Sequence, residues 1–130
     1  MQLSTDDLLT IHQRIIDKLG GTSGLRDPGM LQAIVSKPNA SFGGDELYPD
    51  IPAKAAALYE AVINYHVFID GNKRTSVIAL GLYLEQNGFD LTATNDEIEK
   101  YTIRVATSQP NLADVAIWIR NHIKPHKDRN

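Results

Sequence analysis

A short polar run, His66 to Thr75, separates two apolar segments and most constrains how this chain can fold. Apolar residues recur with helical spacing before the run, and a second apolar segment after it reaches Gln86. Gly71 in the middle of the run indicates a tight turn. The pattern predicts one helix ending near Tyr65 and a central buried helix over 73–86, joined by a polar loop that leads into the second helix's first turn.

Capping residues predict four further helices. Ser4, with Asp7 three positions later, resembles a capping box for a helix that ends at Gly20-Gly21. Other expected starts are Asp27-Pro28, Asp50 with Pro52 for the helix ending near Tyr65, Thr94 or Asn95, and Pro110-Asn111, the last helix extending to Ile123. Since no segments form convincing strand pairs, we expect an all-α fold, a compact bundle of about six helices.

The segment from Lys37 to Asp50 is rich in proline, glycine and small polar residues, which predicts a loop. Phe42, Leu47 and Tyr48 are its expected apolar anchors, and loops of this length are often functional lids. Residues 89–91 are expected to form a short extended piece. At 130 residues the chain has the size of one domain, which we place at residues 1–124, followed by a polar C-terminal tail over 125–130.

The composition is that of a globular protein without disulfides or membrane spans. The chain is 42% hydrophobic and 22% charged, which is typical of a globular protein, and it has no cysteine for disulfides or thiolate metal sites. A net charge of -3 argues against direct nucleic-acid binding through a basic surface, although a local cationic pocket remains open. No segment approaches the roughly 20 apolar residues of a membrane span, and the N-terminus is acidic. We therefore expect a cytoplasmic protein without membrane contact.

The loop-to-helix junction has the chemistry of an anion site. A helix that begins at Asn72 or Lys73 presents backbone N–H groups without intrahelical partners, at the positive end of its dipole. Gly71 permits a sharp turn and a close approach by a ligand. Lys73 and Arg74 oppose the dipole in this first turn, so their presence suggests a compensating anion such as phosphate.

Two further residues supply possible chemistry. Asp70 could hold Mg²⁺ against nucleotide phosphates, because this metal usually takes only one or two protein carboxylates. His66 could accept the proton of an incoming hydroxyl, since imidazole has a reference pKa of about 6.5. Phe68 is expected to point the other way and to anchor the loop in the core.

Each of these residues also has a purely structural interpretation. A histidine after a helix is more often a capping or partly buried residue, a lone aspartate a turn former, and a Lys-Arg pair a solvated surface. His12, His122, His126, Trp118 and the tyrosines are interpreted as structural. Only the concentration of polar residues between two helices favours the functional interpretation of His66 to Thr75.

The run His66-x-Phe68-x-Asp70-Gly71-Asn72-Lys73-Arg74-Thr75 resembles the signature of the Fic/Doc (Fido) superfamily, and specifically of its death-on-curing (Doc) toxin branch. Similar stretches cover most of residues 3–123. They are Gly20-Gly21, the segment 24–31, Phe42-Gly43-Gly44, the segment 46–49 and the segment 84–89.

This resemblance implies a Fido fold in which the segment from Lys37 to Asp50 is a flap that docks a target peptide. It also implies an enzyme that transfers part of a nucleoside triphosphate, such as ATP, to a protein hydroxyl. Nucleotidyl-transferring Fic members carry Gly in place of Lys73 and Arg in place of Val77. Members with the lysine resemble Doc, which delivers the γ-phosphate to a threonine of translation elongation factor Tu and arrests translation.

Carried over by position, the resemblance makes His66 the general base, Asp70 the Mg²⁺ ligand and Phe68 the core anchor. Gly71, Asn72, Lys73, Arg74 and Thr75 form the phosphate cradle. Gly71 instead favours nucleotidyl transfer, because it belongs to the nucleotidyl-transferring signature whereas Doc itself carries Ala. The chemistry implied is in-line phosphoryl transfer, which depends mainly on positioning and charge neutralisation.

Self-inhibited relatives carry a Glu followed by Gly or Asn in an inhibitory helix, and no Glu of this chain is followed by either residue. Restraint is therefore expected from a Phd-like antitoxin whose disordered C-terminal segment folds into a helix on the toxin. The alternatives are a Fic-type nucleotidyl transferase (AMPylation) and a catalytically idle regulatory binding module.

Overall fold

The computed structural model describes residues 2–126 of the chain, and this part folds into six α-helices with a few short additional elements. The helices are α1 (Thr5–Leu19), α2 (Pro28–Ser36), α3 (Ile51–Asn64), α4 (Asn72–Gln86), α5 (Asn95–Ser108) and α6 (Leu112–Arg120). A 3₁₀ helix, η1 (Lys37–Asn39), follows α2. The expected number of helices is confirmed, and so is the predominantly helical architecture.

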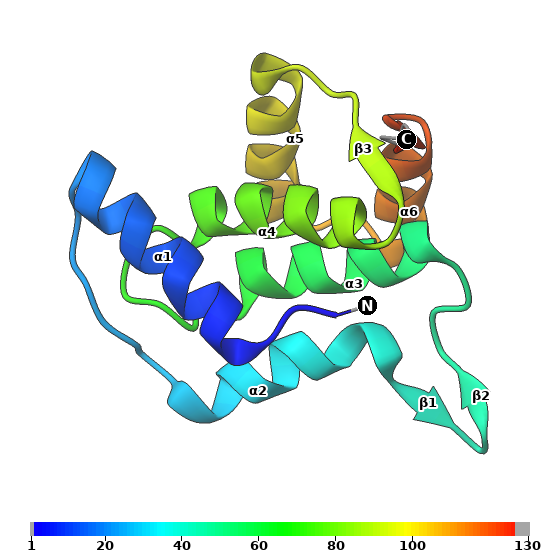
Figure 1. Ribbon diagram of the computed structural model, residues 1–130, viewed down its shortest axis with the longest axis horizontal. Helices are drawn as coiled ribbons and strands as arrows, with labels where there is room; N and C mark the ends of the chain where they lie inside the picture. Colours follow the sequence, from blue (N-terminus) through cyan, green and yellow to red (C-terminus); the bar gives the residue numbers. More distant parts are fainter. Residues whose placement is uncertain (1, 127–130) are drawn as a thin grey trace.

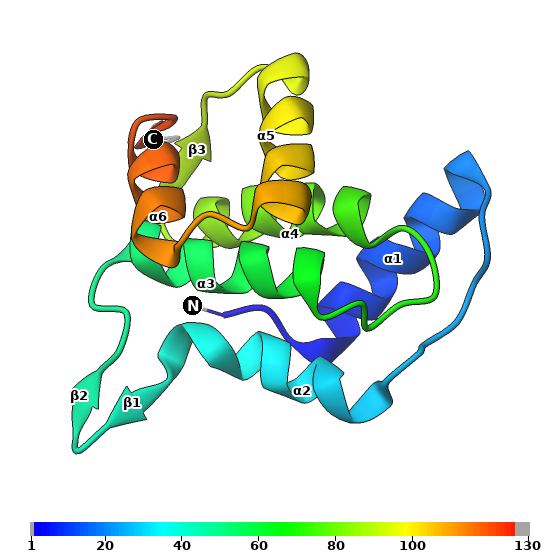
Figure 2. The same cartoon turned by 180° about the vertical axis from the view of Figure 1, so that it is seen from behind.

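Helices α3 and α4 lie side by side in the middle of the molecule and are joined by the loop over residues 65–71 (Figure 1). Helices α1 and α2 pack on one side of this pair, and α5 and α6 pack on the other (Figures 1 and 2). The core is built mainly from α3, ten of whose fourteen residues are buried. Within residues 2–126, no helix combines the length and the apolar character that crossing a membrane requires.

The helix starts follow local capping chemistry. The Ser4 hydroxyl accepts the Asp7 N–H at 3.0 Å while the Asp7 carboxylate accepts the Ser4 N–H at 2.8 Å, so the expected capping box is confirmed. Thr94, rather than Asn95, caps α5 through a second capping box with Glu97. Asp27, Asp50 and Asn111 cap α2, α3 and α6.

Helix α4 begins and ends within one residue of the predicted bounds, but it is not buried on all sides. Its buried residues include Thr75 and Ser76, whereas Ile78 is 51% exposed and Val77 is only half-buried. The cause is the packing of α1 and α5, which leaves a groove along this side of α4. The expectation of a fully buried central helix is therefore wrong for one face of α4, and α3 is the more buried helix.

The structure corrects the expectation that strand pairs are absent. Strands β1 (Ser41–Phe42) and β2 (Asp45–Glu46) form a hairpin, and β3 (Phe89–Leu91) pairs antiparallel with β4 (Ile123–Pro125). Helix α6 ends at Arg120, so Ile123 belongs to β4 and not to the last helix. The pairing also orders Lys124 to His126, which overlap the predicted tail over 125–130, and residues 127–130 of that tail lie outside the described part.

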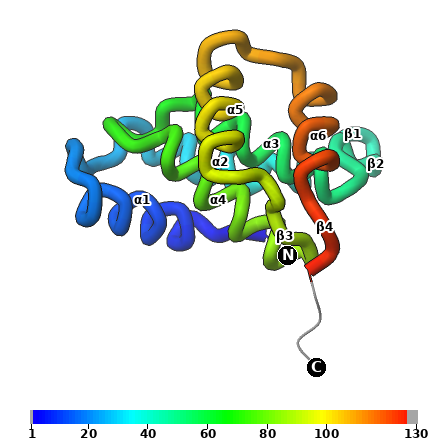
Figure 3. Tube along the Cα trace, turned by 90° about the horizontal axis from the view of Figure 1, so that it is seen from above, coloured from blue at the N-terminus to red at the C-terminus, as the bar shows by residue number. Residues whose placement is uncertain are grey.

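The β1–β2 hairpin occupies the middle of the expected flap, but it does not lie over the polar loop. The hairpin extends from the end of α3 opposite to the loop over 65–71 (Figures 1 and 3). Two of its three expected apolar anchors are exposed, Phe42 by 81% and Leu47 by 53%. The hairpin is held instead by Lys54, whose ammonium group donates to the Pro38 carbonyl at 3.2 Å and to Glu46 at 2.9 Å.

Candidate active site

The connection between α1 and α2 holds the polar loop in place by backbone pairing. The Arg26 N–H donates to the Val67 carbonyl at 2.7 Å, and the Ile69 N–H donates to the Gly24 carbonyl at 3.2 Å. Leu25 and Phe68 face each other in an isolated antiparallel bridge. The loop is thus fastened to a segment more than 40 positions earlier in the sequence.

Phe68 and His12 form the buried base of the loop. Phe68 is 1% exposed, which confirms its predicted place in the core. His12 of α1 is 3% exposed and stacks on Phe68 with ring centroids 3.8 Å apart and planes 5° from parallel. A His12 ring nitrogen, Nε2, lies 2.7 Å from the Asp70 carbonyl oxygen. From the sequence, His12 is interpreted as a structural residue, and no sequence pattern indicates its contact with the loop.

The loop closes on itself just before α4. The Asn72 side chain donates to the Phe68 carbonyl at 2.9 Å and accepts the Phe68 N–H at 3.2 Å, so its amide is committed to the loop. Gly71, with φ at +82°, is the N-cap of α4 and offers no side chain to cap the first turn. The first-turn N–H groups of Asn72, Lys73 and Arg74 therefore remain available to an anion.

Lys73 and Arg74 are exposed, and within residues 2–126 neither makes an ion pair. Both line a cleft of about 580 Å³ together with His66, Asp70, Gly71 and Asn72. Ile15 and Leu19 of α1, Ala106 of α5 and Gln109 just after α5 also line the cleft. This volume lies within the usual range for small-molecule sites, and two unpaired cations at a helix N-terminus give it the character of an anion site.

His66 is exposed at the rim of this cleft and is not buried in packing. Its backbone has φ at +51°, an unusual conformation for a residue with a side chain. The neighbouring residues are fixed: the Tyr65 hydroxyl accepts from the Lys37 ammonium group at 3.0 Å, and Val67 is fully buried. Strained backbone of this kind persists where surrounding contacts enforce it, as they do on both sides of His66.

The Asp70 carboxylate is oriented by two backbone groups. Its Oδ1 accepts the Gly71 N–H at 2.9 Å, and its Oδ2 accepts the Thr22 N–H at 3.3 Å. Each oxygen keeps a further lone pair, so the carboxylate fits as one ligand of a hard cation. Within the described residues no three His, Cys, Asp or Glu side chains form a metal-binding group. A metal ion here would take its other ligands from a bound molecule and water.

Thr75 lies elsewhere. It is fully buried, its hydroxyl has no hydrogen-bond partner, and it does not line the cleft. We therefore leave Thr75 out of the proposed phosphate site, which consists of Gly71, Asn72, Lys73 and Arg74.

Comparison with known proteins shows the family of the chain. Residues 2–84 match the model of the Fic/DOC family, which is more than half of the chain. The chain belongs to the Fic/DOC family. It is 38% identical over 99 residues to a protein of Mycolicibacterium smegmatis named Toxin Doc, covering 75% of this chain and 76% of the relative. It is 30% identical over 118 residues to Protein kinase doc of Escherichia phage P1, covering 91% and 92%. Both relatives are Doc proteins by name, which places the chain in the Doc branch.

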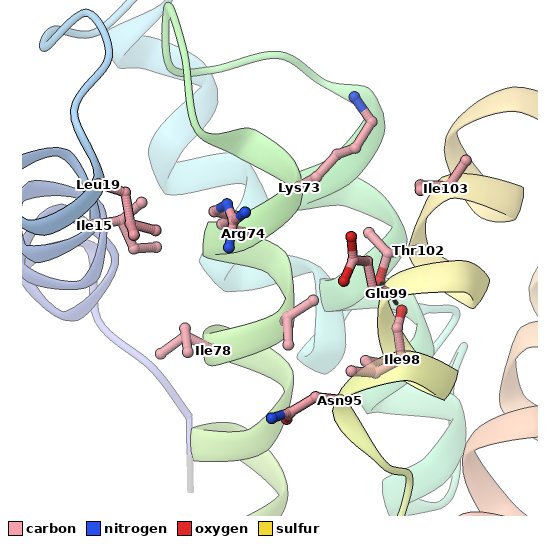
Figure 4. Close-up of a pocket in the computed structure, with 11 residues that line it drawn as sticks. Ile15, Leu19, Lys73, Arg74, Ile78, Asn95, Ile98, Glu99, Thr102 and Ile103 are labelled. Atoms are coloured by element: carbon pink, nitrogen blue, oxygen red, sulfur yellow. Dashed lines mark hydrogen bonds between the residues drawn. The ribbon is translucent and has the colours of Figure 1, made fainter.

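A second concavity of about 580 Å³ adjoins the cleft in this Fic/DOC protein. It is a groove between α1, α4 and α5, with Lys73 and Arg74 at one end and Asn95 at the other (Figure 4). Three of its lining residues are large, apolar and about half exposed, namely Leu19 (58%), Ile78 (51%) and Ile103 (48%). Apolar surface gathered in this way is typical of an interaction site.

Proposed function

We propose that this Fic/DOC protein is a toxin that transfers the γ-phosphate of a nucleoside triphosphate to a protein hydroxyl. The observation that carries this proposal is the pair of unpaired cations, Lys73 and Arg74, in the uncapped first turn of α4. They share one cleft with the exposed imidazole of His66. A phosphate chain held by the helix N-terminus and these cations would lie beside a group that can accept a proton.

In the proposed step, the hydroxyl oxygen of the target attacks the γ-phosphorus and forms the new P–O bond. The bond between that phosphorus and the β–γ bridging oxygen breaks, and the nucleoside diphosphate leaves. His66 accepts the hydroxyl proton, while Lys73 and Arg74 neutralise charge on the phosphates. This chemistry requires the groups to be positioned and charged, and it needs no covalent intermediate on the protein.

Asp70 is the residue that would hold Mg²⁺ in this proposal. When bound, the ion would neutralise phosphate charge and fix the orientation of the triphosphate. The chain's contribution is the orientation of the carboxylate, which the N–H groups of Gly71 and Thr22 hold.

Lys73 favours γ-phosphate transfer over nucleotidyl transfer. A lysine side chain occupies space at the helix N-terminus that glycine would leave open, and it adds a charge suited to the end of a triphosphate. The similarity to a relative named Protein kinase doc supports the same choice. By the resemblance to Doc, we propose a threonine of translation elongation factor Tu as the acceptor, with growth arrest as the consequence.

Incubation of the purified protein with a bacterial extract and ATP labelled at the α or the γ position tests this proposal. Label transferred only from the γ position supports the kinase, and mass spectrometry of the labelled protein identifies the acceptor. Label from the α position would replace the proposal with nucleotidyl transfer, and no label from either position would favour an idle binding module.

The His66→Ala variant should lose at least about 100-fold in transfer rate, the usual contribution of a general base. His126→Ala is the matched control, because His126 follows β4 and does not line the cleft. Its Nδ1 lies 2.7 Å from Asp90 Oδ1. A His66→Ala protein that transfers label at the original rate would remove His66 from the mechanism.

We also propose that the groove between α1, α4 and α5 binds a helical segment of a Phd-like antitoxin. Its exposed apolar residues suit the apolar face of an amphipathic helix, and Lys73 and Arg74 at one end suit an acidic residue on that helix. An antitoxin bound there would also cover the proposed phosphate site, since both cations line the groove and the cleft.

Ile78→Asp should weaken binding of the proposed Phd-like antitoxin in a co-purification assay, because it places a charge in the apolar groove. Ile117→Asp is the control: Ile117 is equally exposed at 51% but lies on α6, outside the groove. Equal loss of the antitoxin in both variants would contradict this placement.

A further inference from the structure

His12 contacts the polar loop both through its ring and through a hydrogen bond. Its ring lies against Phe68, the core anchor of the loop, and its Nε2 reaches the Asp70 carbonyl 58 positions away. The Cβ of an alanine at position 71 would stand 3.6 Å from the His12 ring. One buried side chain of α1 therefore contacts or borders three positions of the polar loop.

The hydrogen bond fixes the tautomer of His12. A backbone carbonyl oxygen can only accept, so the ring nitrogen facing it must carry the hydrogen. The neutral ring in this position therefore has its hydrogen on Nε2 and an unprotonated Nδ1.

The bond also acts on the Asp70 carboxylate. The Asp70 carbonyl and the Gly71 N–H belong to one planar peptide unit and point to opposite sides of it. His12 binds the carbonyl end at 2.7 Å, while the N–H end donates to Asp70 Oδ1 at 2.9 Å. Rotation of this peptide unit would break both bonds and would change the direction in which the chain enters α4.

We propose that His12 is a positioning residue for the active site: by holding the peptide between Asp70 and Gly71, it sets the orientation of the Asp70 carboxylate and of the first turn of α4. His12 does not touch the substrate in this account. The inference rests on the proposed phosphate transfer for its effect on rate, but the contact itself can be tested without it.

Two variants separate the ring from the hydrogen bond. His12→Phe keeps an aromatic ring against Phe68 and removes the donor, whereas His12→Gln removes the ring and places an amide donor near the position of Nε2. The chain also offers a matched control in His122, which stacks on Trp118 at 3.9 Å and has Nδ1 2.7 Å from the Trp118 carbonyl, remote from the loop. His122→Phe makes the same chemical change there.

With ATP and Mg²⁺ as the probe, His12→Phe should lower kcat for label transfer about tenfold, as expected for one lost hydrogen bond. KM for the acceptor protein should stay within about twofold, since His12 does not touch it. His12→Gln should recover part of kcat although it packs less well, and His122→Phe should leave kcat unchanged. A purely structural role would instead make kcat follow the thermal midpoint Tm across all three variants, and that result would overturn the proposal.

A second measurement decides the positioning claim even if the protein transfers no label. Ring nitrogen chemical shifts should show His12 with its hydrogen on Nε2, and the Gly71 N–H should exchange with solvent about tenfold faster in His12→Phe than in His122→Phe. A failure of label transfer in the unmodified protein would then count against the proposed function alone. An Nδ1–H tautomer, or equal exchange at Gly71 in both variants, would overturn the role of His12.

Discussion

Lys73 and Arg74 stand where a helix favours acidic residues. Among residues 2–126 no carboxylate pairs with either of them, and no side chain caps the turn in which they lie. The positive end of the helix dipole therefore repels both side chains in the free protein. A ligand that brings negative charge to this turn would remove the repulsion, so the same residues that weaken folding would strengthen binding.

Lys73→Gln should raise the free energy of unfolding by about 0.3–1 kcal/mol, because it removes a cation from the first turn. It should also weaken binding of ATP with Mg²⁺ at least about tenfold, as expected for a lost charged hydrogen bond. Lys18→Gln is the control with the opposite sign, since Lys18 lies in the last turn of α1, where a cation is favourable. Urea unfolding and calorimetric titration measure the two effects. A less stable Lys73→Gln protein would contradict this account.

Gly21 makes room for the Asp70 carboxylate. A Cβ at Gly21 would stand 2.7 Å from Asp70 Oδ2, whereas a Cβ at Gly20 would meet nothing within 4 Å. Both glycines have positive φ, so alanine at either position costs about 1–2 kcal/mol of backbone strain. Gly21→Ala should therefore lose more stability than Gly20→Ala and should weaken Mg²⁺-dependent ATP binding more. Equal losses in both assays would mean that the carboxylate can move without consequence.

The place of the loop residues at the start of α4 was predictable because their signals are local. Gly71, Lys73 and Arg74 are adjacent in the sequence, and the physics of a helix N-terminus applies to any such run. The contact of His12 with Asp70 was not predictable, since it spans 58 positions and no local pattern indicates it. The burial of Thr75 was not predicted either: four positions after Gly71, the turn of the helix directs its side chain into the core and away from the cleft.

At the scale of elements, the helices followed from caps and apolar spacing, whereas the strands did not. Ser4, Asp50 and Asn111 each bond an N–H three positions ahead, so the start of each helix lies within a few residues of its cause. Strand β3 pairs with β4 across more than 30 positions, and each strand has only three residues. Strands this short are too brief for an alternating pattern of apolar and polar residues, so the sequence does not predict the pairing.

The β1–β2 hairpin is an element whose position depends on one buried lysine. Lys54→Met keeps the length of the side chain and removes the donor to Pro38 and Glu46. The free energy of local opening should fall by about 1–2 kcal/mol, seen as faster hydrogen exchange of the Leu47 N–H that bonds the Ala40 carbonyl. Lys100→Met is the control, because Lys100 is 77% exposed on α5. An altered His66 resonance in Lys54→Met would contradict our placement of the hairpin away from the site.

For the molecule as a whole, buried tyrosines make the stability of the fold depend on pH in the alkaline range. Burial raises the pKa of Tyr59 far above its usual value of 10.0, and a hydrogen bond to Thr102 at 2.5 Å opposes this only in part. Burial also raises the pKa of Tyr83 and Tyr101. Because these pKa values are higher in the folded state, their contribution to stability is present below pH 10 and is lost as the pH rises beyond it.

Above pH 10, the folded protein should lose about 1.4 kcal/mol of stability per pH unit for each tyrosine that stays neutral while the unfolded chain ionises. Tyr59→Phe should reduce this slope by one such unit, at a cost of about 0.5–1.5 kcal/mol near neutral pH. Denaturant unfolding at a series of alkaline pH values measures the slope, and tyrosinate absorbance reports the ionisation. An unchanged slope in Tyr59→Phe would show that Tyr59 ionises without unfolding.

We propose above all that the N-terminus of α4 binds the phosphates of a nucleotide beside His66. Titration of the protein with ATP and Mg²⁺, followed through the backbone amide chemical shifts, tests this most directly. We expect the largest shifts at the amides of Asn72, Lys73 and Arg74, a response of the His66 ring, and loss of both in an Arg74→Ala variant. Saturating nucleotide that leaves these three amides unmoved, or that moves another part of the molecule instead, would contradict the account.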